Sequence, residues 1–121
     1  MTERILVVED QEHNRRILRD LLTSVGYELI EAVTGSEGVR LARSHRPDLI
    51  LMDIQLPELD GHEATRQIKA NLDLRAIPII VVTSYALSGD ETKALAAGAD
   101  AYVTKPFSPR QLLAKVRELL G

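Results

Sequence analysis

Short runs of apolar residues recur along the chain and are separated by longer segments of mixed polarity. Three of these runs, at 5–8, 49–52 and 79–82, are continuous and rich in β-branched residues. Such runs are typical of strands that are buried on both faces of a parallel sheet. The run at 27–32 is more mixed and predicts an edge strand, and the short run at 101–103 predicts the opposite edge.

The segments between these runs have the periodicity of amphipathic helices. We expect two apolar series at helical spacing to face the sheet: Ile17, Leu18, Leu21, Leu22 and Val25 near the start of the chain, and Leu112, Leu113, Val116, Leu119 and Leu120 near its end. Capping residues followed three positions later by Glu or Gln predict helix starts at Thr34, Asp60, Ser88 and Ser108.

Strand and helix alternate five times, which predicts an α/β fold whose parallel sheet is covered by helices on both faces. The 121 residues contain no linker and no internal repeat, so we expect a single domain over residues 1–121. Met1 and the helix that ends at Leu120 and Gly121 favour a chain that stands alone.

Composition narrows the functional classes. The net charge is −3 and no block of Lys or Arg is present, which disfavours direct nucleic-acid binding. The absence of Cys excludes disulfides and thiol chemistry. Neither a signal-peptide pattern nor an apolar run of membrane-spanning length occurs, so we expect a cytoplasmic protein without membrane insertion. His13, His45 and His62 lie far apart and are interpreted as surface residues.

Polar residues follow the predicted strands at the points where sites form in such sheets, the carboxyl ends. Glu9 and Asp10 follow the first strand, Asp53 the third, Thr83 the fourth and Lys105 the fifth. Three converging carboxylates repel one another and suit Mg²⁺, which prefers oxygen ligands. A carboxylate such as that of Asp53 can act as a nucleophile toward phosphorus, while Lys105 and the metal offset charge on the transferred phosphoryl group.

Together these residues resemble the receiver domain of bacterial response regulators, and are most similar to the single-domain regulators of the DivK type. The resemblance rests on the segments 8–10, 48–57, 60–61, 78–83 and 105–107. It implies a CheY-like, flavodoxin-like (βα)5 three-layer sandwich with a five-stranded parallel sheet of order 2-1-3-4-5. It also implies a two-component or phosphorelay signalling switch whose partner is a histidine kinase or a histidine phosphotransfer protein.

The resemblance assigns a role to each matching position. Asp53 is the expected phosphoacceptor and Lys105, preceding a cis proline, is expected to pair with the phosphoryl group. Asp10 is expected to bind Mg²⁺ directly, and Glu9 to act mainly through metal-bound water. The backbone carbonyl of Gln55 completes the expected metal ligands, together with Asp53 itself.

The resemblance further implies that Thr83 and Tyr102 form a switch pair. Phosphorylation is expected to change the surface of the fourth helix, fifth strand and fifth helix, which would contact a downstream protein. The first helix and the loop after Lys105 are expected to dock the phosphodonor through Arg15, Leu18, Pro106 and Phe107; without that context, Arg15, Arg16 and Arg19 are interpreted as a solvated helix face. Ser84 departs from the usual pattern. Tyr85 occupies a position that tunes phosphoryl lifetime in this family, and we expect it to shield the phosphoryl group from water.

Two other functions are compatible with parts of the pattern. An aspartyl-nucleophile phosphotransferase or phosphatase similar to the haloacid dehalogenase group needs a second Asp two residues after the nucleophile, where this chain has Gln55. A receiver-like scaffold that takes no phosphate would be expected to lack the acidic pair, Asp53 or Lys105, and all are present. The main hypothesis is therefore a switch that catalyses only its own phosphorylation and dephosphorylation.

Overall fold

The structure is a computed structural model that describes residues 2–83 and 90–121. The expectations for Ser84, Tyr85 and the helix start at Ser88 lie outside this range. Strands and helices alternate in the following order: β1 (Arg4–Val8), α1 (Glu12–Thr23), β2 (Glu28–Ala32), α2 (Gly35–His45), β3 (Leu49–Asp53), α3 (Gly61–Ala70), β4 (Ile79–Thr83), α4 (Asp90–Ala96), β5 (Ala101–Thr104) and α5 (Pro109–Leu120).

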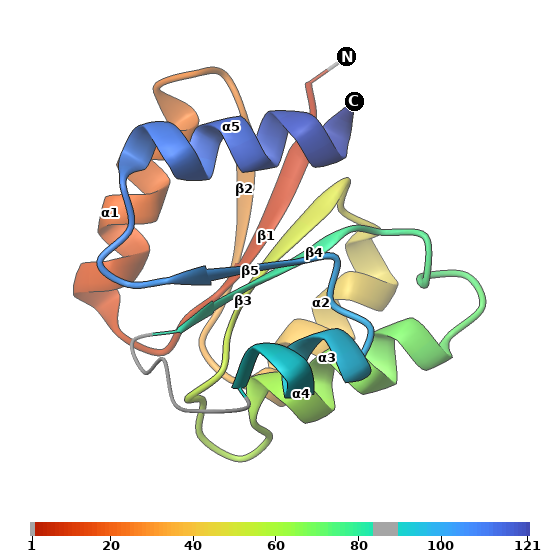
Figure 1. Cartoon of the computed structure of the whole chain (residues 1–121). Coiled ribbons are helices and arrows are strands. Elements are labelled where there is room, and N and C mark those ends of the chain that lie inside the picture. The colour runs from red at the N-terminus through yellow and green to blue at the C-terminus, as the bar shows by residue number, and fades with distance from the viewer. Residues whose placement is uncertain (1, 84–89) are drawn as a thin grey trace.

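The five strands form one parallel sheet in the order β2-β1-β3-β4-β5, as expected. The strands predicted at the edges, β2 and β5, are the edge strands. Helices α1 and α5 cover one face of the sheet, and α2, α3 and α4 cover the other (Figure 1). The predicted α/β sandwich of three layers is therefore confirmed.

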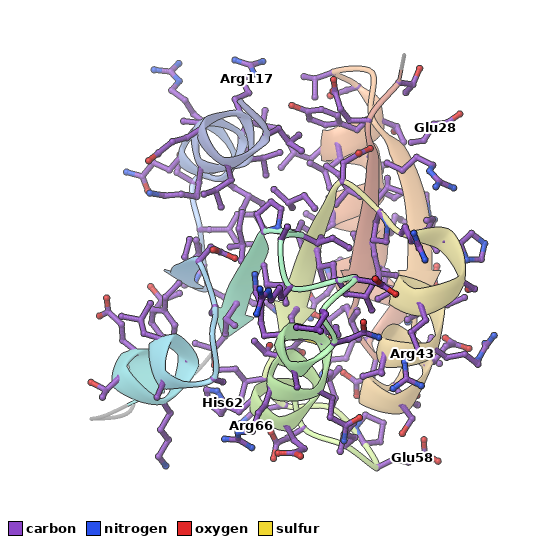
Figure 2. The ribbon with its side chains drawn as sticks, turned by 90° about the vertical axis from the view of Figure 1, so that its right-hand side faces the viewer. Glu28, Arg43, Glu58, His62, Arg66 and Arg117 are labelled. Atoms are coloured by element: carbon purple, nitrogen blue, oxygen red, sulfur yellow. The ribbon has the colours of Figure 1, made fainter. Side chains whose placement is uncertain are left out.

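Alternate residues of each central strand point into two separate cores. Leu6 and Ile50 pack with α2, α3 and α4, while Ile5 and Leu49 pack with α1 and α5. Because both faces of these strands are covered, all four side chains have no exposed surface. Figure 2, turned by 90°, shows side chains filling the space between the sheet and the helices, with Arg117 on the outer side of α5.

The predicted helix starts at Thr34, Asp60 and Ser108 are confirmed. Each side chain accepts a hydrogen bond from the backbone N–H three residues later, which satisfies one of the unpaired donors of the first turn. The carboxylate of Glu37 reaches back to the N–H of Val33 at 2.8 Å. These local bonds fix where α2, α3 and α5 begin.

Two predicted core residues of α1 do not face the sheet. Ile17 is 45% exposed because the buried stripe of α1 runs through Leu18 and Leu22, and Ile17 lies beside that stripe. Val25 is 40% exposed because α1 ends at Thr23 and the chain turns at Gly26, whose φ is 96°. The prediction that Val25 faces the sheet is wrong, because it extended the helical period beyond the end of α1.

One histidine is also placed differently from the expectation. His13 and His45 are exposed, as predicted. His62, near the start of α3 and labelled in Figure 2, is half-buried, and neither of its ring nitrogens forms a hydrogen bond in the structure as described. Its interpretation as a plain surface residue is therefore wrong.

No helix within residues 2–83 and 90–121 is long and apolar enough to cross a bilayer.

Candidate functional site

The sheet register brings the carboxyl ends of β1, β3, β4 and β5 together along one edge of the sheet. Val8 of β1 pairs with Met52 of β3, and Asp53 pairs with Val82 of β4. Glu9 follows Val8 and Asp53 follows its partner Met52, so the two carboxylates lie side by side at the carboxyl end of the sheet. Thr83, the last residue of β4, lies at this edge as well.

Lys105 enters this edge from the loop after β5. Its backbone N–H donates to the carbonyl of Thr83 at 2.6 Å, and the Lys105–Pro106 bond is cis, as expected. Its ammonium nitrogen Nζ lies 2.7 Å from Oε1 of Glu9 and 4.0 Å from Oδ2 of Asp53. The predicted convergence of an ammonium group with the carboxylates is thus present.

Three carboxylates gather around this ammonium group. One oxygen from each of Glu9, Asp10 and Asp53 lies within 4.8 Å of the others. Glu9 and Asp53 are only 2% and 8% exposed, whereas Asp10 is exposed. Oε2 of Glu9 also accepts the N–H of Gln11 at 3.2 Å, so both oxygens of this carboxylate are already engaged by the protein.

The pKa values of the acidic residues reflect three carboxylates facing one ammonium group. Burial, and then the charge of Glu9, raise the pKa of Asp53 to about 7, although the charge of Lys105 acts in the opposite direction. Burial alone would raise the pKa of Glu9, but the hydrogen bond and charge of Lys105 outweigh it and the net direction is down. Desolvation and the neighbouring Glu9 raise the pKa of Asp10. The ammonium group therefore neutralises Glu9 more completely than Asp53 and Asp10.

These residues fit a divalent cation. Carboxylate oxygens close together are the ligands that Mg²⁺ takes, and a second positive charge would offset the repulsion that raises the pKa of Asp53. Asp10 is exposed and Asp53 faces the same cluster, so both can offer an oxygen to an ion. Gln55 follows Asp53 closely enough for its N–H to lie 3.4 Å from Oδ1 of that residue.

Gly61 allows α3 to begin directly beside Asp53. A Cβ atom at this position would lie 2.0 Å from the backbone oxygen of Asp53 and 2.8 Å from Cα of Ile54. The N–H of Gly61 donates to the carbonyl of Ile54 at 2.9 Å. The sequence suggested a turn at Asp60 and Gly61, but the need for a missing side chain arises only from this close approach.

A groove leads away from Lys105 toward α1. It has a volume of about 610 Å³ and is lined by Gln11, Asn14, Ile17, Leu18, Lys105, Pro106, Phe107 and Pro109. The exposed position of Ile17 is thereby explained, since its side chain forms part of this wall. Three of the four residues expected to dock a phosphodonor line the groove, but Arg15 does not.

The family comparison follows from these features. The sequence model of the response regulator receiver domain matches residues 5–117, which include every residue of the cluster. The chain belongs to the response regulator receiver family. This receiver is 46% identical over 121 residues to the polar-differentiation response regulator DivK of Brucella ovis, in an alignment that covers all of this chain and 98% of the relative. The expected similarity to DivK-type regulators is confirmed.

Solved structures of receivers have the same fold. The receiver domain of a sensor histidine kinase from Pseudomonas aeruginosa PAO1 superposes with a TM-score of 0.93 at 40% identity, covering 100% of this chain and 99% of that one. That structure has a magnesium ion coordinated in its active-site cleft. The chemotaxis protein CheY4 of Vibrio cholerae gives a TM-score of 0.91 at 26% identity, covering 98% and 99% of the two chains. The expected Mg²⁺ cofactor is consistent with the ion in the Pseudomonas receiver.

Tyr102 lies away from the cluster, on the edge strand β5. It pairs with Val81 of β4, so it is on the face of the sheet that α2, α3 and α4 cover. Thr83 lies two residues after Val81 on the same strand, and therefore on the same face. Tyr102 is half-buried and packs against the core on that side. The two predicted switch residues thus share a face, with Thr83 nearer to Asp53.

The arginines of α1 are not a uniform solvated face. Arg16 is exposed, but the side chain of Arg15 is only 12% exposed and Arg19 forms two hydrogen bonds with Glu31 of β2, at 2.9 Å and 2.7 Å. These bonds lower the pKa of Glu31. Sequence reasoning missed the pairing, although a Glu flanked by apolar residues within a strand signals that a partner is needed.

Proposed function

We propose that this receiver is a phosphorylation-dependent switch over its single domain, residues 1–121, and that Asp53 accepts the phosphoryl group. The observation that carries the proposal is the buried carboxylate of Asp53 beside the ion pair of Glu9 and Lys105, at the carboxyl end of the sheet. The pKa of about 7 for this buried carboxylate, with an ammonium group within 4.0 Å, marks a functional site at which a bound cation would offset negative charge.

The transfer is a displacement at phosphorus. One carboxylate oxygen of Asp53 forms a bond to the phosphorus of a phosphohistidine, the P–N bond breaks, and the imidazole leaves with the electron pair and takes up a proton. The product is an acyl phosphate. The proposed donor is the phosphohistidine of a histidine kinase or of a phosphotransfer protein, and the groove beside Lys105 supplies an apolar surface on which such a partner can dock.

Charge on the transferred group is offset from two sides. Lys105 already lies 4.0 Å from Asp53, within reach of a phosphoryl oxygen, and Thr83 offers a hydroxyl donor at the same edge. Asp10, Asp53 and the carbonyl of Gln55 would hold Mg²⁺, which supplies electrostatic stabilisation of the phosphoryl oxygens when bound. Because both oxygens of Glu9 are engaged by the protein, Glu9 would act through metal-bound water.

The output is a change of surface. A phosphoryl group on Asp53 would attract the hydroxyl of Thr83, and movement of Thr83 would change the space available to Tyr102 on the same face of the sheet. The surface formed by α4, β5 and α5 would then change and bind a downstream protein. Phosphorylation biases two existing states through local charge, so the switch needs no large rearrangement.

Intact-mass analysis after incubation with acetyl phosphate tests this function. We expect one phosphoryl adduct that requires Mg²⁺ and that is absent from Asp53→Asn. Peptide mapping should place the adduct on Asp53. An adduct of equal yield on Asp53→Asn would exclude Asp53 as the acceptor, and no adduct under conditions that label a known receiver would favour a scaffold that takes no phosphate.

A further inference from the structure

The guanidinium group of Arg15 joins the acidic cluster to the neighbouring helix and strand. Its Nη1 donates to the backbone carbonyl of Glu9 at 2.9 Å. Its Nη2 pairs with the carboxylate of Glu12 one turn earlier in α1, and its Nε lies 3.5 Å from Oε1 of Glu31 on β2. With a side chain only 12% exposed, Arg15 is held from three sides in one position.

The carbonyl that Arg15 contacts belongs to the peptide bond between Glu9 and Asp10. Other groups fix the rest of Glu9: its N–H donates to the carbonyl of Ala32 at 3.0 Å, and its carboxylate pairs with Lys105. A peptide unit is planar, so fixing the Glu9 carbonyl also fixes the N–H and Cα of Asp10. The direction in which the Asp10 side chain leaves the backbone therefore depends on the contact with Arg15.

We propose that Arg15 is a positioning residue for the cation site, because it orients the Glu9–Asp10 peptide so that the Asp10 carboxylate faces Asp53. This inference rests on the proposed function, in which Asp10 is a metal ligand. Groups that orient metal ligands contribute strongly to metal affinity even though they do not touch the ion. Arg19 also pairs with Glu31, but the contact with the Glu9 carbonyl comes from Arg15.

The positive charge of Arg15 should weaken cation binding, whereas its positioning effect should strengthen it. A positive charge near the cluster repels a divalent cation, although Glu12 and Glu31 beside the guanidinium offset that charge. Removing Arg15 would therefore strengthen cation binding if charge were its main effect, and would weaken binding if orientation were. The sign of the change separates the two roles.

The test is the binding of Mn²⁺ alone to the full chain, measured from the electron paramagnetic resonance signal of the free ion. We expect Arg15→Met to weaken binding by about tenfold, as is typical when a group that orients a metal ligand is lost. Arg15→Lys can return one hydrogen bond to the Glu9 carbonyl, so its affinity should lie between the two. Arg19→Met is the matched control: it loses the Glu31 pair but leaves the Glu9 contact in place, so Mn²⁺ affinity should stay close to wild type.

The outcomes separate this inference from the proposed function. If the wild-type chain binds no Mn²⁺, both fail. If it binds Mn²⁺ and labels on Asp53, while Arg15→Met binds as tightly as wild type or more tightly, only the role of Arg15 is refuted. An equal loss in Arg19→Met would also refute it, because the loss would then follow from general loosening of α1 and β2. Circular dichroism without metal checks folding, and Arg15→Lys carries the test if Arg15→Met does not fold.

Discussion

Replacing Asp53 by Asn should make the protein more stable, and the gain should depend on pH. The pKa of Asp53 is about 7 in the folded chain, against an ordinary value of 3.8. Between these values the folded state holds a proton that the unfolded state has released. The contribution of the protonated Asp53 to stability is therefore fully present below about pH 4 and is lost as the pH rises through about 7. Asn cannot ionise, so the variant avoids that loss.

The magnitude follows from the size of the shift. A displacement of about three pKa units corresponds to about 4 kcal/mol, at about 1.4 kcal/mol per unit. This value is a ceiling, because the carboxylates of Asp53 and Glu9 titrate together and because solvent reaches the carboxyl end of the sheet. We expect a gain of about 2 kcal/mol at pH 8 relative to pH 4, equivalent to about 8 °C in Tm for a chain of this length.

The assay is urea and thermal denaturation followed by far-UV circular dichroism, in metal-free buffer, between about pH 4 and pH 9. The difference between Asp53→Asn and wild type should widen from about pH 4 and level off above about pH 7. Asp73→Asn serves as the control for the loss of one carboxylate, since Asp73 is exposed in the loop between α3 and β4, outside the acidic cluster. A constant difference for Asp53→Asn would refute the electrostatic reasoning about the cluster.

Three further changes test how the fold supports the site. Gly61→Ala should lose at least about 2 kcal/mol in urea denaturation, because its Cβ would lie 2.0 Å from the backbone oxygen of Asp53; a neutral result would mean that α3 can move away freely. Lys69→Met should cost about 2 kcal/mol, since Nζ of Lys69 donates hydrogen bonds to two backbone carbonyls and to Asp100. Lys69→Arg keeps the charge and should cost less, and no loss in either variant would mean that these hydrogen bonds contribute nothing. Thr34→Ala should cost about 1 kcal/mol by removing a helix cap while Thr34→Ser should not; equal stability of all three chains would contradict the capping role.

The sequence alone determined the order of elements and which polar residues meet at the candidate site. Continuous β-branched runs are stable only where both faces of a strand are covered, so the parallel sheet follows from the pattern at Ile79 to Val82 and its counterparts. Local bonds fix the helix starts, because a cap such as Thr34 needs only the residues that follow it. The polar residues at the strand ends identified Asp53 and its partners, since parallel strands bring their carboxyl ends to one edge.

The tertiary structure decided features that depend on which elements become neighbours. Helical periodicity could not separate Ile17, which is 45% exposed, from Leu18, which is buried, because the difference depends on which side of α1 meets the sheet. The bond from Arg15 to the Glu9 carbonyl and the close approach of Gly61 to Asp53 also depend on distances between segments. Spacing along a chain encodes local geometry, whereas contacts between a helix and a loop are set only when the whole sheet has packed.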